Sequence, residues 1–183
     1  MKKLRGQQRK DAVLSEVVKC FVGGILKQWW VSSFFTTPTI NGYKRYQPYS
    51  LAPDRPLRGR DNRGAMLRVV GGFGDSGTRI ENRVGEPAAN PYLYLASQIY
   101  AGLDNLHNRL EPSSPVDAPY DTPVTPLPSS LLDATFALKE DTGFREKLGD
   151  RFIDYLLHIK EAEINRFLTT VTDWEQREYF EIF

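Results

Sequence analysis

Apolar residues recur every three or four positions in several stretches of the chain, a spacing that predicts amphipathic helices. The first helix begins after Ser15, and two glycines within it, Gly23 and Gly24, indicate close packing against a neighbouring element. The second begins at Asn90-Pro91, a pair suited to an N-cap and a first helical position. Further helices are expected over residues 129–140, over 150–172 and at the aromatic C-terminal end. The positions expected to face inward are Val18, Phe21, Val22, Ile25, Leu26 and Trp29; Tyr92, Leu95, Ala96, Ile99, Leu103, Leu106 and Leu110; and Ile153, Leu156, Leu157, Ile164, Phe167, Leu168 and Val171.

Two shorter stretches, residues 66–70 and 78–84, predict an antiparallel strand pair. In the second stretch charged and uncharged residues alternate, which places Arg79, Glu81 and Arg83 on one face. Residues 34–56 are expected to form extended loops, and the Pro-rich residues 112–128 a surface excursion. The expected class is α+β, with antiparallel strands, packed helices and a helix-rich C-terminal half.

Length and charge restrict the kind of protein and partner. The chain has 183 residues, enough for one domain, and a net charge of +1. Residues 44–83 contain nine basic residues against four acidic ones, which favours an anion site there. We expect residues 1–14 to be a basic N-terminal extension and residues 15–183 to form the domain. Cys20 is the single cysteine and excludes an internal disulfide, and neither a secretory signal nor an apolar membrane span is evident. The expected location is therefore cytoplasmic, with no membrane partner.

The candidate chemistry lies between residues 41 and 83, where five arginines accompany a carboxylate, Glu81. Arginine suits the oxygens of carboxylates and phosphates, and a carboxylate beside bound phosphates suits Mg²⁺. One alternative is a solvated surface on which Glu81 pairs with Arg79 and Arg83. A second is nucleic-acid binding through residues 58–64, but Asp61 interrupts this tract and the aromatic residues precede it, so no nucleic-acid partner is expected. The arginines are Arg45, Arg63, Arg68, Arg79 and Arg83.

Four motifs, in order, resemble the C-terminal part of the glutamine synthetase catalytic domain, over about residues 15–183: NGYKRYQPYSLAP, GRDNRGAMLRV, TRIENRVGEPAANPYLYLASQIYAGLDNL and TDWEQREYF. The resemblance implies an ATP-dependent ligase that phosphorylates glutamate to γ-glutamyl phosphate, which ammonia or an amine then attacks. It implies ATP and Mg²⁺ (or Mn²⁺) as cofactors. The helices that follow Pro91 would be scaffold and subunit contact.

The resemblance also implies a role for each charged residue of these motifs. Arg63 would contact the substrate and the transferring phosphoryl group, and so take part in catalysis. Arg45 and Arg83 would bind the amino-acid substrate. Arg68 and Arg79, together with Arg63, would bind the nucleotide. Glu81 would be a metal ligand.

Departures from the family pattern qualify this assignment. Ammonia-using members carry a flap glutamate where this chain has Leu51, which favours a bulkier amine as nucleophile. A nucleotide-binding lysine is replaced near Ser76, and the surroundings of Tyr120 do not match an adenylylated tyrosine loop. His107 and His158 lie on expected helices and do not replace the family's metal-binding histidine.

The family's other metal-binding glutamates, its metal-binding histidine and its small N-terminal domain would lie upstream of Met1. The chain is therefore expected to be incomplete as an enzyme alone, and to need an upstream N-terminal chain or a homo-oligomer. The alternative is a non-catalytic fragment or a regulatory, anion-binding module derived from a glutamine synthetase.

Overall fold

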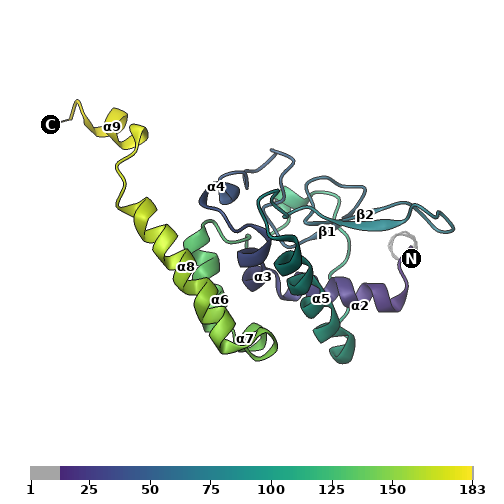
Figure 1. Ribbon diagram of the computed structural model, residues 1–183. Coiled ribbons are helices and arrows are strands. Elements are labelled where there is room, and N and C mark those ends of the chain that lie inside the picture. The colour runs from purple at the N-terminus through teal and green to yellow at the C-terminus, as the bar shows by residue number, and fades with distance from the viewer. Residues whose placement is uncertain (1–12, 183) are drawn as a thin grey trace.

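The computed structural model describes residues 13–182, so the expected basic extension over residues 1–14 lies almost wholly outside the described residues. Three helices precede a small three-stranded sheet in the described chain, and helices follow the sheet (Figure 1). The α-helices are α2 (Glu16–Lys27), α3 (Trp29–Thr36), α4 (Ile40–Tyr43), α5 (Pro91–Asn108), α6 (Leu131–Glu140), α7 (Thr142–Leu148), α8 (Asp150–Leu168) and α9 (Asp173–Tyr179). The strands are β1 (Arg58–Arg60), β2 (Leu67–Val70) and β3 (Arg79–Asn82), and a 3-10 turn, η1, covers Pro119–Asp121.

The helix starts predicted from the sequence are confirmed by their caps. The Ser15 hydroxyl accepts a hydrogen bond from the first turn of α2, and the Asn90 side chain accepts two from the first turn of α5, where Pro91 is the first residue. Ser130 caps α6 in the same way, and Thr172 forms a capping box at α9. These side chains satisfy backbone N–H groups that have no partner within the helix.

The prediction of extended loops over residues 34–56 is wrong at its start. α3 continues through Phe34 and Phe35, whose rings are buried in the core. Burial of two aromatic side chains outweighs their modest helix propensity. Pro38 then ends the helix, and Thr39 caps the short helix α4.

The predicted antiparallel strand pair is confirmed as β2 and β3, with Arg68 opposite Glu81 in the register. A third strand, β1, pairs in parallel with β2, giving the sheet order β1-β2-β3. The hairpin between β2 and β3 extends away from the helices (Figure 1). The sheet therefore presents the charged residues of β2 and β3 beside one another.

Two groups of buried residues form the core. One lies among α3, α4, α6, α7 and α8, and the other lies among α2, α5 and the sheet. The first comprises Val31, Phe34, Phe35, Tyr43, Leu131, Ala134, Ala137, Leu138, Phe144, Ile153, Leu157 and Ile164, and the second Val22, Ile25, Leu26, Met66, Leu67, Val84, Ala101 and Leu127.

The expected close packing at the two glycines of α2 is confirmed. A Cβ atom on Gly24 would collide with the backbone oxygen of Ala101 and the side chain of Asn105, both on α5. A Cβ atom on Gly23 would lie 2.8 Å from the Asn105 side-chain nitrogen. The same Asn105 amide donates a hydrogen bond of 2.7 Å to the Cys20 carbonyl, so a side chain of α5 contacts the backbone of α2 directly.

The inward face predicted for α5 is wrong. Its stripe of large apolar side chains faces solvent, with Tyr92 82% exposed and Leu95 56% exposed. The face packed against α2 and α3 instead carries small or polar residues: Ser97, Gln98, Ala101, Gly102 and Asn105. Close approach to the glycines of α2 requires small side chains at this contact, which leaves the large ones outside.

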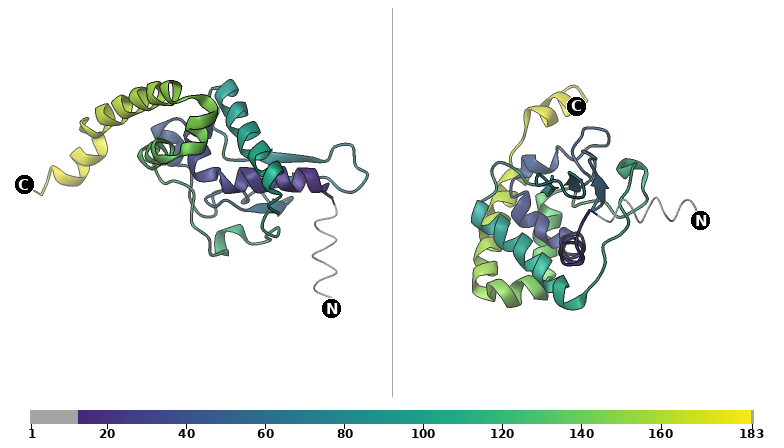
Figure 2. Two further views of the ribbon diagram at one scale, coloured as in Figure 1. Left: turned by 90° about the horizontal axis from the view of Figure 1, so that it is seen from below. Right: turned by 90° about the vertical axis from the view of Figure 1, so that its right-hand side faces the viewer.

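α8 lies along one side of the molecule, and α9 extends from its far end away from the sheet (Figures 1 and 2). Ile153, Leu157 and Ile164 of α8 are buried as predicted, whereas Phe167, Leu168 and Val171 are exposed, which corrects their assignment to the core. α9 has no buried residue. Within residues 13–182, no helix has the length and apolar character needed to cross a membrane.

Candidate functional site

Glu81 of β3 lies among three arginines, which we call the arginine cluster: Arg68, Arg79 and Arg83. One carboxylate oxygen accepts a hydrogen bond of 3.1 Å from Arg68, and the other accepts one of 2.9 Å from Arg79. Arg83 lies 4.0 Å from the first oxygen, and Arg68 also pairs with Asp61. Such pairing also occurs on surfaces without function, so the pairing alone does not identify a site.

The arginines determine the ionisation of both carboxylates. Partial burial raises the pKa of Glu81, but the hydrogen bond from Arg79 and the charge of Arg68 outweigh it and hold the pKa below its usual value. The hydrogen bond and charge of Arg68 lower the pKa of Asp61. Both groups are therefore anionic at neutral pH and offset part of the positive charge of the arginine cluster.

The two other predicted arginines, Arg63 and Arg45, are linked by hydrogen bonds to Arg83 or to the residue that follows it. The Arg83 guanidinium donates hydrogen bonds of 2.8 Å to the carbonyl of Arg63 and 3.1 Å to that of Leu51. Arg63 itself is exposed. Arg45 is half-buried and donates to the carbonyl of Val84, the residue that follows Arg83. All five predicted arginines thus lie at β2, β3 and the segments adjoining them.

The described residues fit anions better than they fit a metal ion. The buried Nε atoms of Arg45 and Arg68 have no hydrogen-bond partner among the described residues, so both guanidiniums keep donor capacity that their ion pairs and hydrogen bonds leave unused. Glu81 can supply one metal ligand, but both of its oxygens are held by arginines. Among residues 13–182, no three His, Cys, Asp or Glu side chains gather at one point to hold an ion. These arginine side chains therefore suit oxyanions, and the described residues do not form a metal site by themselves.

Residues 47–53, which we call the flap loop, border the arginine cluster. Tyr49 and Leu51 both adopt left-handed backbone conformations, with φ of 62° and 61°, which cost free energy in residues other than glycine. Their side chains are 72% and 54% exposed. The hydrogen bond from Arg83 to the Leu51 carbonyl fixes the middle of this loop beside the cluster.

The Pro-rich residues 112–128, which we call the strap, hold the flap loop from the other side. The strap is the expected surface excursion, but its contacts with the flap loop were not predicted. Tyr120 of the strap donates a hydrogen bond of 3.1 Å to the carbonyl of Ala52, and its ring packs against Gly64. As the one aromatic residue of the strap, Tyr120 is the signal that could have revealed this contact.

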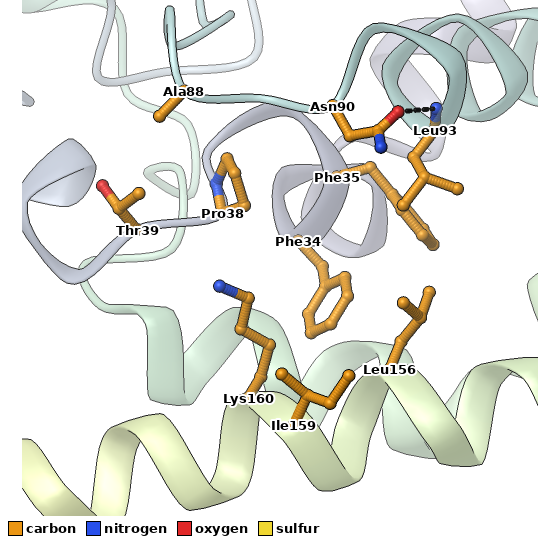
Figure 3. A pocket seen from close by; sticks show the side chains of 10 residues that line it. All are labelled: Phe34, Phe35, Pro38, Thr39, Ala88, Asn90, Leu93, Leu156, Ile159 and Lys160. Atoms are coloured by element: carbon orange, nitrogen blue, oxygen red, sulfur yellow. Dashed lines mark hydrogen bonds between the residues drawn. The ribbon is translucent and has the colours of Figure 1, made fainter.

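A cavity of about 230 Å³ lies elsewhere, between α3, the start of α5 and α8 (Figure 3). Its lining is mainly apolar, with the Lys160 side chain at one side. No predicted site residue lines this cavity, so we do not place the reaction there. The lining residues are Phe34, Phe35, Pro38, Thr39, Ala88, Asn90, Leu93, Leu156, Ile159 and Lys160.

The remaining residues singled out in the sequence lie on helices or in an exposed turn. His107 is exposed on α5 and His158 is exposed on α8, both away from the strands. Cys20 is partly exposed on α2. Ser76 lies in the exposed turn between β2 and β3.

Comparison with known proteins identifies the family. Residues 3–179 match the catalytic domain of glutamine synthetase. The chain is 46% identical over 182 residues to the gamma-glutamylanilide synthase of an Acinetobacter species, covering 93% of this chain and 36% of that protein. It is 34% identical over 178 residues to the glutamine synthetase of Methanococcus voltae (92% and 40% covered). It is 36% identical over 178 residues to the gamma-glutamylethanolamide synthetase of Streptomyces coelicolor (97% and 38% covered).

The chain thus spans about two fifths of the length of the curated relatives it matches. The match to the catalytic domain nevertheless extends over nearly all of its own residues, including both strands of the arginine cluster. The protein belongs to the glutamine synthetase family.

Proposed function

We propose that this chain supplies the arginine-rich part of the active site of an ATP-dependent glutamate–amine ligase. In the proposed reaction the γ-carboxylate of glutamate takes the terminal phosphoryl group of ATP, giving γ-glutamyl phosphate and ADP. The amine then displaces phosphate to form the amide. The observation that carries this proposal is the cross-strand pair of Arg68 and Glu81, with Arg79 and Arg83 around it, in a chain of this family.

The arginines would act by binding and by offsetting negative charge. Arg68 and Arg79 would hold nucleotide phosphates, and Arg63 would contact the transferring phosphoryl group. Arg45 and Arg83 would bind glutamate. Because Arg83 is already held by two backbone carbonyls, its orientation costs little to fix when substrate arrives.

Glu81 is the one residue in this set that would hold a divalent cation. A bound Mg²⁺ or Mn²⁺ ion supplies further neutralisation of phosphate charge. Glu81 would first have to release Arg68 and Arg79, which then become free to bind phosphate oxygens. We propose that the remaining metal ligands come from outside residues 13–182, in a further chain or a homo-oligomer.

The nucleophile is proposed to be an amine larger than ammonia. Leu51 occupies the flap position and cannot accept a proton, so it cannot help to deprotonate ammonium. Two relatives reported above are named for gamma-glutamyl amides of aniline and of ethanolamine, which supports an amine as the substrate class.

Two measurements test the proposed function. The first is ATP binding by calorimetry to the purified chain and to Arg68→Gln, with Arg166→Gln, on exposed α8, as the matched control. We expect Arg68→Gln to weaken binding and Arg166→Gln to leave it unchanged. Equal affinity in all three proteins would exclude the arginine cluster as the nucleotide site.

The second measurement is phosphate release from ATP in the presence of Mg²⁺, glutamate and a panel of amines. It is made with the chain alone, and with a second polypeptide that contains the part of the Acinetobacter gamma-glutamylanilide synthase not matched by this chain. We expect release only in the second case. Binding of ATP without amide formation from any amine would instead indicate a non-catalytic, anion-binding module.

A further inference from the structure

The cavity between α3, the start of α5 and α8 has no part in the proposed function, but its lining is suited to a ligand (Figure 3). Phe34 and Phe35 of α3 lie on one side, and Leu156 and Ile159 of α8 lie opposite them. Lys160 of α8 is the one charged residue of the lining. We propose that this cavity binds a small apolar monocarboxylate, with its apolar body between the two helices and its carboxylate on the Lys160 ammonium. The inference does not rest on the proposed function.

The volume of the cavity sets the size of the ligand. It measures about 230 Å³. An apolar cavity of about 150 Å³ lined by Leu, Ile and Phe binds benzene, and pockets for drug-sized molecules begin at about 300 Å³. The cavity therefore fits a body the size of a single aromatic ring that carries a carboxylate, and it is too small for a nucleotide.

The aromatic side of the cavity is fixed before any ligand binds. Phe34 and Phe35 are each only 3% exposed and belong to the core. The Phe35 ring stacks on that of Phe144, with centroids 5.4 Å apart, so the core holds it in place. Ile159 on the opposite side is 42% exposed, and an apolar ligand would remove part of this surface from water. A rigid wall of this kind lowers the cost of ordering the site on binding.

Lys160 gives the cavity a preference for negative charge. Its side chain is 21% exposed, and its ammonium pairs at 2.7 Å with Glu163, which lies one turn further along α8 and does not line the cavity. An ammonium carries several N–H donors, so Lys160 can bind a ligand carboxylate while it keeps this pair. Its aliphatic stem adds to the apolar lining.

The two uncharged polar side chains of the lining are engaged within the protein. The Thr39 hydroxyl donates to the Glu86 carboxylate, which also accepts a hydrogen bond of 3.3 Å from the Thr39 N–H. Glu86 does not line the cavity. The side-chain oxygen of Asn90 accepts two hydrogen bonds from the first turn of α5. The Lys160 ammonium is therefore the lining group that distinguishes an anionic ligand from a neutral or cationic one of the same shape.

The test uses the full chain and saturation-transfer NMR with benzoate, benzyl alcohol, benzylamine and acetate as probes. We expect the strongest transfer to benzoate, less to benzyl alcohol, and least to benzylamine, which is a cation at neutral pH, and to acetate, which lacks the ring. Lys160→Met should weaken benzoate binding by about two- to fivefold, the contribution of a partly exposed ion pair, and leave benzyl alcohol binding unchanged. Ile159→Trp, which fills the cavity from α8, should abolish the transfer to both ring probes.

Two control variants locate the bound benzoate. Lys147→Met removes an exposed lysine of α7 that pairs with Glu146, and should leave benzoate binding unchanged. Arg68→Gln removes a cation of the arginine cluster, the other place where a carboxylate could bind, and should also leave it unchanged. A loss in either variant equal to that in Lys160→Met would overturn the inference, because benzoate would then bind elsewhere or without specificity.

Two further results would also overturn it. Equal binding of benzoate and benzyl alcohol by the unmodified chain would show that Lys160 does not select for a carboxylate. Unchanged transfer to benzoate in Ile159→Trp would show that the ring does not lie in the cavity. Neither result would bear on ATP binding at the arginine cluster, which is measured separately.

Discussion

Replacing Glu81 by glutamine should increase the affinity of the chain for phosphate when no divalent cation is present. Glu81 holds both Arg68 and Arg79 through its two oxygens, and so competes directly with an external anion. A phosphate on the far side of these guanidiniums would lie roughly 6 Å from the carboxylate. Removing a unit charge at that distance changes a binding constant by about threefold in water, and by more where the effective dielectric constant is lower. We therefore expect at least a roughly threefold gain in phosphate affinity at low salt.

Phosphate binding is measured by calorimetry on Glu81→Gln and the unmodified chain at low and at physiological salt. The matched control is Asp154→Asn, which removes a carboxylate paired with Arg145 at 2.8 Å on the helices, where Asp150 still pairs with the same arginine. It should leave phosphate binding unchanged. Weaker phosphate binding by Glu81→Gln would refute the idea that Glu81 competes with an external anion. An equal gain in phosphate affinity in Asp154→Asn would refute it too. Added salt should reduce the gain, because exposed charges are screened.

Four further results are expected. Gly24→Ala should destabilise the fold by about 1–3 kcal/mol in urea unfolding, because the added methyl overpacks the α2–α5 contact. Gly72→Ala should not, because its methyl would meet only the end of the Arg60 side chain, at 3.7 Å. The ion pair of Asp61 stabilises the fold at pH values above the usual aspartate pKa of about 4, and this stabilisation is lost as the pH falls through the lowered pKa of Asp61 in the folded state. Asp61→Asn should therefore reduce the difference between the urea unfolding midpoints measured at pH 7 and at pH 3. In the ligase completed with a second polypeptide, Leu51→Glu should raise the ratio of ammonia to amine turnover; an unchanged ratio would contradict the reading of the flap position. The lone chain should associate, since α5 and α9 expose large apolar side chains, and a monodisperse monomer in light scattering would contradict this.

The strand pair could be predicted because its signal is local. Alternation along residues 78–84 placed Arg79 and Glu81 on one face, and the structure shows them hydrogen bonded. The pairing of Glu81 with Arg68 depends on the register of the β2–β3 hairpin, whose loop has no short turn signature to predict that register. The third strand, β1, could not be predicted because its residues show no alternation of apolar and polar side chains. Its middle residue is a buried glycine against the strap, a contact that sequence spacing does not encode.

The flap loop shows a second limit. Its motif placed Leu51 at the flap position, but the orientation of Tyr49 and Leu51 follows from left-handed conformations that neither residue type favours. These conformations are kept by Arg83 and by the strap about 70 residues further along the chain. Local propensity therefore predicts the opposite of what the tertiary contacts impose, as is common at functional sites.

α5 shows why periodicity found the helix and assigned the wrong face. A helical period identifies two faces, and the large apolar one is normally taken to be buried. Which face is buried depends on the neighbouring helix. Gly24 on α2 allows so close a backbone approach that a small side chain is needed opposite, as at Ala101, and Gly102 makes room in the same way for the ring of Phe21. The glycine pair was visible in the sequence as a sign of close packing. Matching it to the small residues of α5, rather than to the leucines, would have assigned the buried face correctly.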